Sequence, residues 1–278
     1  MPRMNNISNL LFKEKLIERL PSIPKVVHEV WKIIEQKNAE PAKVSEVISK
    51  DISLSVKVLK LVNSPFYGFP NRISSIKHAV ILLGLDAIRG LLISTVVFGD
   101  INEEIKDMWD HACDCATIAG IIAKVLDIKE SDELTVAGLL HDMGKVILKN
   151  YFPELEAKIK TLQKIENIPD SEAEKKVIGI SHDTINKWIT EKWHFPPILT
   201  EAIVFHHNIS GAGKYHLFSA VIGLADFLSY LYRLSPDKLN LPNMDEKICG
   251  ILGLNPKVMD KIFSEMDKTL YTINWDEF

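Results

Sequence analysis

The sequence contains few cysteines and no segment with the pattern of a secretion signal. Its 278 residues include three cysteines, Cys113, Cys115 and Cys249, an odd number with no CxxC pair among them. The opening residues, MPRMNNISNL, lack the apolar core of a signal peptide. These absences exclude a disulfide-stabilised secreted domain, and we expect a reducing, cytoplasmic setting.

A strong net charge and a long apolar run are also absent. Lysine and arginine number 33 against 37 aspartates and glutamates, which gives a formal charge of -4. Such a balance creates no overall field for nucleic acid or an anionic membrane, so we expect neither as a partner. The longest apolar runs, such as Leu91–Phe98, fall far short of the roughly 20 residues of a spanning helix. We therefore expect no membrane segment.

What the sequence does contain is helical periodicity, and we expect an all-α fold. Apolar residues recur at helical spacing within the ranges 26–34, 52–62, 109–126, 198–207 and 217–232. The segment LLISTVVFG is rich in β-branched residues, but no neighbouring segment offers a strand to pair with it, so we expect a helix there as well. No repeat of about 20–50 residues occurs, which excludes a solenoid.

Two longer helices are expected around polar residues. The sequence AGLLHDMGKVIL predicts one continuous helix. Ser171 and Glu174 form a capping-box pattern for a helix that runs past His182 toward Trp193. Turn-forming residues divide the chain into an N-terminal helical lobe at 1–102, a second helical lobe at 103–232 and a short helical tail at 233–278.

Ionisable side chains interrupt the apolar faces of several expected helices. His111 lies in helical register with apolar residues 4, 7 and 8 positions later, and His182 with apolar residues 3 and 7 positions later. Both imidazoles should therefore face a core. Asp226 is the only charged residue between 217 and 232. Two further pairs stand between apolar runs, namely His141 with Asp142 and His206 with His207.

Each of these residues has an ordinary structural explanation when it is taken alone. A single inward histidine is most often a hydrogen-bonded core residue, and a lone aspartate often caps a helix or pairs with a base. Burying several ionisable groups without compensation is costly, however, and few basic residues other than Lys145 lie nearby. A shared cation is the simpler solution, and a polar pocket without one is the alternative.

The type of side chain indicates which cation to expect. Imidazoles and carboxylates without thiolates are typical of a catalytic transition metal such as iron, manganese, nickel or zinc, rather than of structural zinc or calcium. We therefore expect a divalent metal site made by His111, His141, Asp142, His182, His206, His207 and Asp226.

The order of these residues resembles a known family. His111, His141-Asp142 within HDMGK and Asp226 within GLADFL are similar to the H…HD…D pattern of HD-superfamily metal-dependent phosphohydrolases. The first half contains LPSIPKVV, DISLSVKVLKLVNSPFYG and ISSIKHAVILLGLDAIRG, which resemble the HDOD family, the HD-related output domain of bacterial signalling proteins. The resemblance covers about residues 16–232. It implies a multi-helical HD-like fold with an N-terminal helical lobe, in a bacterial signal-transduction protein.

The resemblance also implies roles for the polar residues. A metal-dependent phosphohydrolase of this kind would act on a phosphoester or nucleotide with one or two divalent ions. One ion would be held by His111, His141 and Asp226, the other by His182, His206 and His207, and Asp142 would lie between them. Lys145 follows Asp142 by three positions, so its ammonium could contact phosphate; a lysine that only reaches solvent is the alternative.

Two considerations keep a second function open. Many HDOD proteins serve as regulatory modules, so the alternative is a non-catalytic output module that binds a protein partner or a small ligand. In addition, His206-His207 resemble a pair in the HD-GYP cyclic-di-GMP phosphodiesterases. That family continues with an acidic residue and a Gly-Tyr-Pro loop, whereas this sequence continues with Asn208-Ile209-Ser210-Gly211. The substrate-recognition element of that family is absent, so the sequence gives little support for cyclic-di-GMP as the substrate and leaves other phosphoesters open.

Overall fold

Prolines and short polar side chains begin several helices of this chain, for which we describe a computed structural model. Pro41, Pro153 and Pro197 each occupy the first turn of a helix, where the missing N–H is not needed. Asp51 and Ser75 cap helices by accepting backbone N–H groups at 2.9 Å and 3.2 Å. The structure describes residues 2–36, 38–63, 67, 69, 71–99, 103–234 and 245–270.

Over these residues the chain forms helices and no strand, so the expected all-α fold is confirmed. The first part of the chain forms α1 (Pro2–Arg19), α2 (Lys25–Ile34), α3 (Pro41–Ser49), α4 (Ile52–Val62) and α5 (Ile76–Phe98). The middle forms α6 (Lys106–Val125), α7 (Ser131–Leu140), α8 (Met143–Tyr151), α9 (Pro153–Glu166), α10 (Asp170–Ile178), α11 (His182–Lys192) and α12 (Pro197–Val204). After the short 3-10 turn η2 (Ile209–Gly211) come α13 (His216–Leu234), α14 (Glu246–Leu252) and α15 (Pro256–Leu270).

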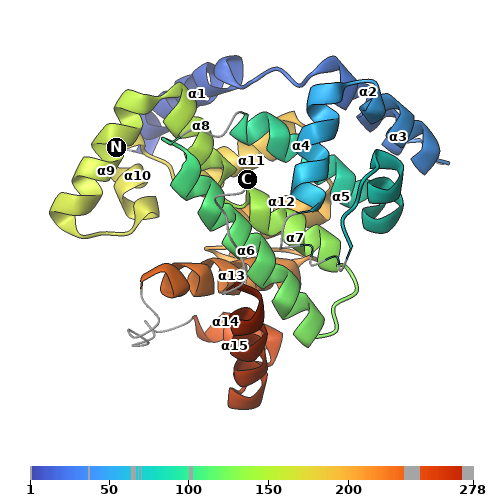
Figure 1. The fold of residues 1–278 in the computed structure, drawn as a ribbon. Helices are drawn as coiled ribbons and strands as arrows, with labels where there is room; N and C mark the ends of the chain where they lie inside the picture. The colour runs from blue at the N-terminus through green and yellow to red at the C-terminus, as the bar shows by residue number, and fades with distance from the viewer. Residues whose placement is uncertain are drawn as a thin grey trace.

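Helix α6 lies at the centre of the molecule. It packs most extensively against α7 and α13, and its residues are buried almost continuously from Trp109 to Ala123. Figure 1 shows α1 to α5 arching over the upper part of the molecule, while α14 and α15 lie below α6 and α13. The central helices α6, α7 and α13 therefore carry their polar side chains into the interior.

Helix α5 corrects the expectation that no apolar segment reaches a membrane-spanning length. Its 23 residues are long and apolar enough, by length and composition, to cross a bilayer, because it contains LLISTVVF and the apolar run before it. However, 61% of its most apolar stretch is buried within the protein, and Gly84 interrupts it with a φ of 76°. Packing in the core accounts for the apolar character of α5.

Two expected continuous helices are each divided in the structure. The segment AGLLHDMGKVIL separates into α7 and α8 at His141 and Asp142, because Asn186 binds the backbone there: it accepts the Gly144 N–H and donates to the His141 carbonyl. The helix expected to run to Trp193 separates into α10 and α11 at Gly179, which has a left-handed φ of 82°. Both breaks place polar residues at helix ends.

The capping box expected at Ser171 and Glu174 was wrong. Helix α10 begins at Asp170, after Pro169, so Ser171 lies inside the helix rather than before it, and the N-terminus has no side-chain cap. Glu174 is buried instead and binds His182. The predicted boundary at 102 lies outside the described residues, as do residues 235–244 and 271–278 of the predicted tail.

A buried arginine joins the N-terminal helices to the rest of the molecule. The guanidinium of Arg89, on α5, lies 5.2 Å from the centre of the Trp31 ring of α2 and 3.7 Å from the Glu35 carboxylate. It also donates to the backbone carbonyl of His194, just beyond α11. Since Arg89 is only 7% exposed, its contacts with Trp31 and the His194 carbonyl are shielded from water, whereas the Glu35 side chain is 57% exposed and adds little.

Replacing Arg89 with methionine should lower the free energy of unfolding by about 3 kcal/mol, because a charged hydrogen bond and a cation–π contact are lost together. Chemical denaturation followed by circular dichroism would measure this. The control is Arg72→Met at an exposed position, for which we expect a change below about 0.5 kcal/mol. Equal effects of the two substitutions would show that Arg89 does not stabilise the junction.

Candidate metal centre

The polar residues singled out in the sequence converge in the centre of the fold. His111 comes from α6, His141 and Asp142 from the α7–α8 junction, His182 from the start of α11, His206 and His207 from the turn after α12, and Asp226 from α13. Sequence periodicity had placed His206 and His207 on a helix, whereas the structure ends α12 at Val204. All of these side chains nevertheless meet in one region.

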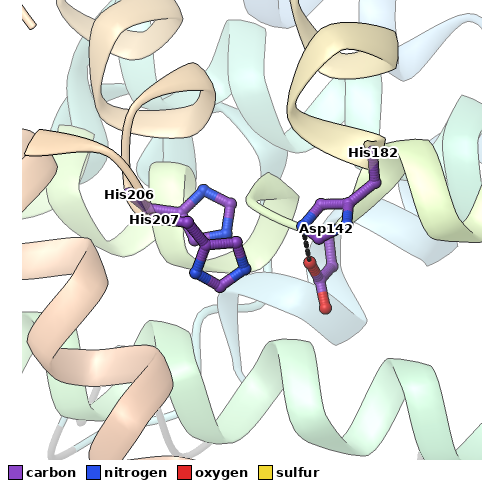
Figure 2. A group of neighbouring side chains, drawn as sticks. All are labelled: Asp142, His182, His206 and His207. Carbon is purple, nitrogen blue, oxygen red and sulfur yellow. Dashed lines mark ion pairs between the residues drawn. The ribbon is translucent and has the colours of Figure 1, made fainter. Parts of the chain in front are cut away.

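They form two adjacent groups, in each of which the ligand atoms lie within 4.8 Å of one another. We call the first the Asp142 group and the second the Asp226 group. The Asp142 group consists of Asp142, His182, His206 and His207, and the Asp226 group of His111, His141 and Asp226. Figure 2 shows the Asp142 group, with the rings of His206 and His207 side by side and facing Asp142 and His182.

Asp142 faces both groups. Its Oδ1 atom lies 3.5 Å from Nε2 of His182, within its own group. Its Oδ2 atom lies 3.7 Å from Nε2 of His111 and 3.5 Å from Nε2 of His141, in the other group. One carboxylate therefore presents a separate oxygen to each group.

The Asp226 group is tightly packed. Oδ1 of Asp226 lies 3.1 Å from Nε2 of His111 and 3.5 Å from Nε2 of His141, and these two nitrogens are 3.2 Å apart. The second oxygen, Oδ2, lies 3.8 Å from Nδ1 of His207. The carboxylate that the sequence analysis found alone on an apolar helix thus has several imidazole neighbours.

Backbone carbonyls orient two of the buried histidines. Nδ1 of His141 lies 2.7 Å from the Gly138 carbonyl, and Nδ1 of His206 lies 2.8 Å from the Ile203 carbonyl. A carbonyl only accepts, so Nδ1 of each ring carries the donated proton. In each ring Nε2 is the nitrogen left for a ligand at the centre.

Three buried atoms of the Asp142 group have no hydrogen-bond partner: Oδ1 of Asp142, Nε2 of His182 and Nε2 of His206. Buried polar atoms without a partner are rare, because desolvation is costly when no hydrogen bond replaces water. A divalent cation would bind all three, and their nitrogen and oxygen donors suit iron, manganese, nickel or zinc. The residues present therefore fit a metal ion.

The protonation states of His206, His207, Asp142 and Asp226 fit metal binding. His141 differs: burial lowers its pKa, but Cys115 and Asp142 outweigh burial and hold that pKa well above its usual value. Burial lowers the pKa of His206 and His207 to about 3, which keeps both imidazoles neutral. Burial raises the pKa of the Asp142 carboxyl, but Lys145 and His141 outweigh it and hold the pKa well below its usual value. Burial also raises the pKa of the Asp226 carboxyl, but its contacts with His111 and His141 keep that pKa well below its usual value. Neutral imidazoles and ionised carboxylates are the forms that coordinate metals.

Lys145 lies beside this centre rather than in free solvent. Its Nζ atom is 2.8 Å from Oδ2 of Asp142 and 3.5 Å from Oδ2 of Asp170, and its side chain is 19% exposed. Burial lowers the pKa of Lys145, but the two carboxylates outweigh it and raise the pKa above its usual value. The ammonium therefore stays charged.

Two glycines allow the helices that carry these residues to approach closely. A Cβ atom on Gly138 of α7 would lie 2.8 Å from the Cα of Ala116 on α6. A Cβ atom on Gly223 of α13 would lie 2.5 Å from the backbone carbonyl oxygen of His206. Side chains at these positions would separate α6 from α7 and α13 from the His206 turn.

The sequence analysis missed several residues that contact the two groups. Glu174 binds His182, and the Ser229 hydroxyl lies 3.2 Å from Nδ1 of His111. Oδ1 of Asp183 is buried 3.5 Å from Nε2 of His182. Asn186 binds the backbone at the α7–α8 break. The spacing of His182 and Asn186, four residues apart on one helix, is a signal that could have identified Asn186.

Comparison with known proteins agrees with this architecture. The model of the HDOD domain family matches residues 20–209, and the chain belongs to that family. The solved structure of an HDOD domain protein with unknown function from Geobacter sulfurreducens is 25% identical, with a TM-score of 0.66, over 94% of this chain and 96% of that one. A Shewanella amazonensis SB2B structure named "Putative phosphohydrolase" is 24% identical, with a TM-score of 0.71 over 91% and 93%, and shares the fold.

One relative is longer than this chain. An uncharacterized protein of Treponema pallidum (strain Nichols) is 29% identical over 200 residues. The match covers 70% of this chain but only 39% of that protein.

Proposed function

We propose that this HDOD protein is a metal-dependent phosphohydrolase in a signalling pathway, acting on a phosphoester or nucleotide. The observation that carries the proposal is the set of buried acceptor atoms without partners in the Asp142 group, next to a second group of imidazoles and a carboxylate. When bound, a divalent ion would supply charge to activate water and to stabilise a phosphoryl group. The name of the Shewanella structure agrees with this chemistry.

Substrate would approach from one side of the centre. His141, His182 and His206 are fully buried, with side chains at most 1% exposed. In contrast, the side chains of His111 and His207 are 19% and 34% exposed. The side between α6 and the turn after α12 is therefore the open one. Lys145, next to Asp142, would hold a phosphate oxygen as a point charge, because its ammonium stays protonated there.

Purified protein should retain a transition metal, and a metal-depleted sample should gain thermal stability when iron, manganese, nickel or zinc is added. Binding at a concentration 100 times Kd stabilises a fold by about 2.7 kcal/mol. Elemental analysis of aerobic and anaerobic preparations, followed by melting curves, would measure both. If neither preparation contains metal and no added ion changes the melting temperature, the ligand assignment is wrong.

A screen of phosphomonoesters, phosphodiesters and nucleotides with the metal-loaded protein would then test the reaction. Hydrolysis in proportion to metal content supports the phosphohydrolase. A metal-loaded protein that hydrolyses none of them would instead support a regulatory module in which the centre stabilises the fold.

A further inference from the structure

A buried carboxylate lies behind His182, on the side of the ring away from Asp142. Glu174, on α10, is only 2% exposed. Its Oε2 atom accepts the backbone N–H of His182 at 2.7 Å and lies 2.8 Å from Nδ1 of the ring, while Oε1 lies 3.0 Å from the same nitrogen. Glu174 thus holds both the backbone and the side chain of one residue.

These contacts determine which ring nitrogen carries the proton. An ionised carboxylate only accepts, so Nδ1 of His182 must donate to Glu174. The lone pair of the neutral ring is then on Nε2, the buried atom without a partner that lies 3.5 Å from Oδ1 of Asp142.

We propose that Glu174 is a positioning residue that keeps Nε2 of His182 directed at the Asp142 group, so that ion binding by this group depends on it. The inference rests on the proposed function for its metal, but the orientation of the ring does not.

The dependence should be confined to one group. The hydrogen bonds that the structure describes for the Glu174 carboxylate all come from His182. In the Asp226 group, His141 is held by the Gly138 carbonyl and His111 contacts the Ser229 hydroxyl. Loss of the Glu174 carboxylate therefore leaves the supports of the Asp226 group in place.

Glu174→Gln tests this with almost no change in volume. The amide oxygen can take the place of Oε2, which accepts the backbone N–H of His182, and the amide nitrogen, a donor, then takes the place of Oε1, 3.0 Å from Nδ1. If the oxygen stays with the backbone N–H, the amide nitrogen donates to Nδ1 and the ring proton moves to Nε2. That proton would then point into the Asp142 group and block ligation.

Nitrogen NMR of the histidine rings in metal-free protein shows directly which ring nitrogen of His182 carries the proton. At a pH high enough to neutralise the imidazoles, wild-type His182 should carry its proton on Nδ1 and the Glu174→Gln variant on Nε2. Glu201→Gln is the matched control: its carboxylate likewise accepts two N–H groups, here both from the backbone, of Gly213 and Tyr215, and the hydrogen bonds described for it involve no proposed ligand. His182 in this control should match the wild type. An unchanged tautomer in Glu174→Gln would overturn the proposal.

Titration with Zn²⁺ alone, against a competing chelator, gives the second readout. In Glu174→Gln we expect the affinity of one class of site to fall by roughly 10- to 100-fold, as is typical when a second-sphere partner is removed, while the other class is unchanged. Equal affinities in variant and wild type would overturn the proposal. If wild type itself binds no Zn²⁺ and no other ion, the proposed function fails, and the tautomer still decides whether Glu174 orients His182.

Discussion

Replacing Gly138 with alanine should lower the free energy of unfolding by about 3 kcal/mol, at the upper end of the cost of overpacking a core. The new methyl group would lie 2.8 Å from Cα of Ala116, 2.9 Å from its amide nitrogen and 3.0 Å from the carbonyl oxygen of Cys115. All three atoms belong to the backbone of α6, so no side chain can rotate away. Helices α6 and α7 would have to separate.

The same substitution should weaken ion binding. Gly138 precedes His141 by one turn and accepts its Nδ1 proton, while α6 carries His111. Moving α7 away from α6 would increase the 3.2 Å distance between Nε2 of His111 and Nε2 of His141. The Asp226 group would then lose its geometry.

Gly250→Ala is the matched control for this experiment. Gly250 lies within α14, and a Cβ atom there would meet nothing within 4 Å. Alanine should therefore stabilise the fold by about 0.5–1 kcal/mol through helix propensity alone. Urea denaturation would measure the free energy of unfolding of both variants, and the values can be compared if the two proteins unfold with the same m-value. A similar gain in Gly138→Ala would mean that α6 and α7 can separate without cost.

The inward direction of the ligand residues could be predicted because helical periodicity is local. His111 and His182 share helix faces with apolar residues, and Asp226 stands alone in an apolar helix, so each had to point into the protein. A helix at LLISTVVF could be predicted for a different reason: no neighbouring segment offers a strand to pair with it. Helix α5 confirms this prediction.

The division into two groups could not be predicted, because it depends on contacts between distant segments. The break at His141 and Asp142 turns Asp142 toward both groups, and Asn186 holds that break from 42 residues beyond Gly144. Glu174 was assigned to a capping box because that pattern is visible locally. Its actual partner, His182, lies beyond the helix break at Gly179. The three-part division of the chain stays a prediction.

The position of Asp142 between the groups leads to a specific expectation for the two as a unit. Because each carboxylate oxygen faces a different group, ions in both would share this residue. His182 has no such double role, because its Nε2 faces Asp142 within its own group. Asp226 is intermediate: its Oδ1 faces His111 and His141, and its Oδ2 lies 3.8 Å from Nδ1 of His207 in the Asp142 group. Substitutions at these three positions should therefore differ in which sites they remove.

Asp142→Asn should weaken ion binding by both groups at once, each by at least about 100-fold, since removing a ligand exceeds the loss of a second-sphere partner. His182→Ala should affect the Asp142 group alone, and Asp226→Asn should affect the Asp226 group more strongly than the Asp142 group. Metal-dependent phosphoester hydrolysis should be lost in Asp142→Asn. Zn²⁺ titration against a chelator, with elemental analysis of the bound ions, would measure the binding of each variant.

The fold of the Asp142→Asn variant should survive, which separates lost ligation from lost structure. Lys145 keeps Asp170 at 3.5 Å as a partner, and the asparagine fills the same volume. The melting temperature of the metal-free variant should therefore stay close to that of metal-free wild type, while the added stability from bound metal disappears. If Asp142→Asn instead retains an ion in one group with wild-type affinity, the two groups are independent and Asp142 belongs to only one of them.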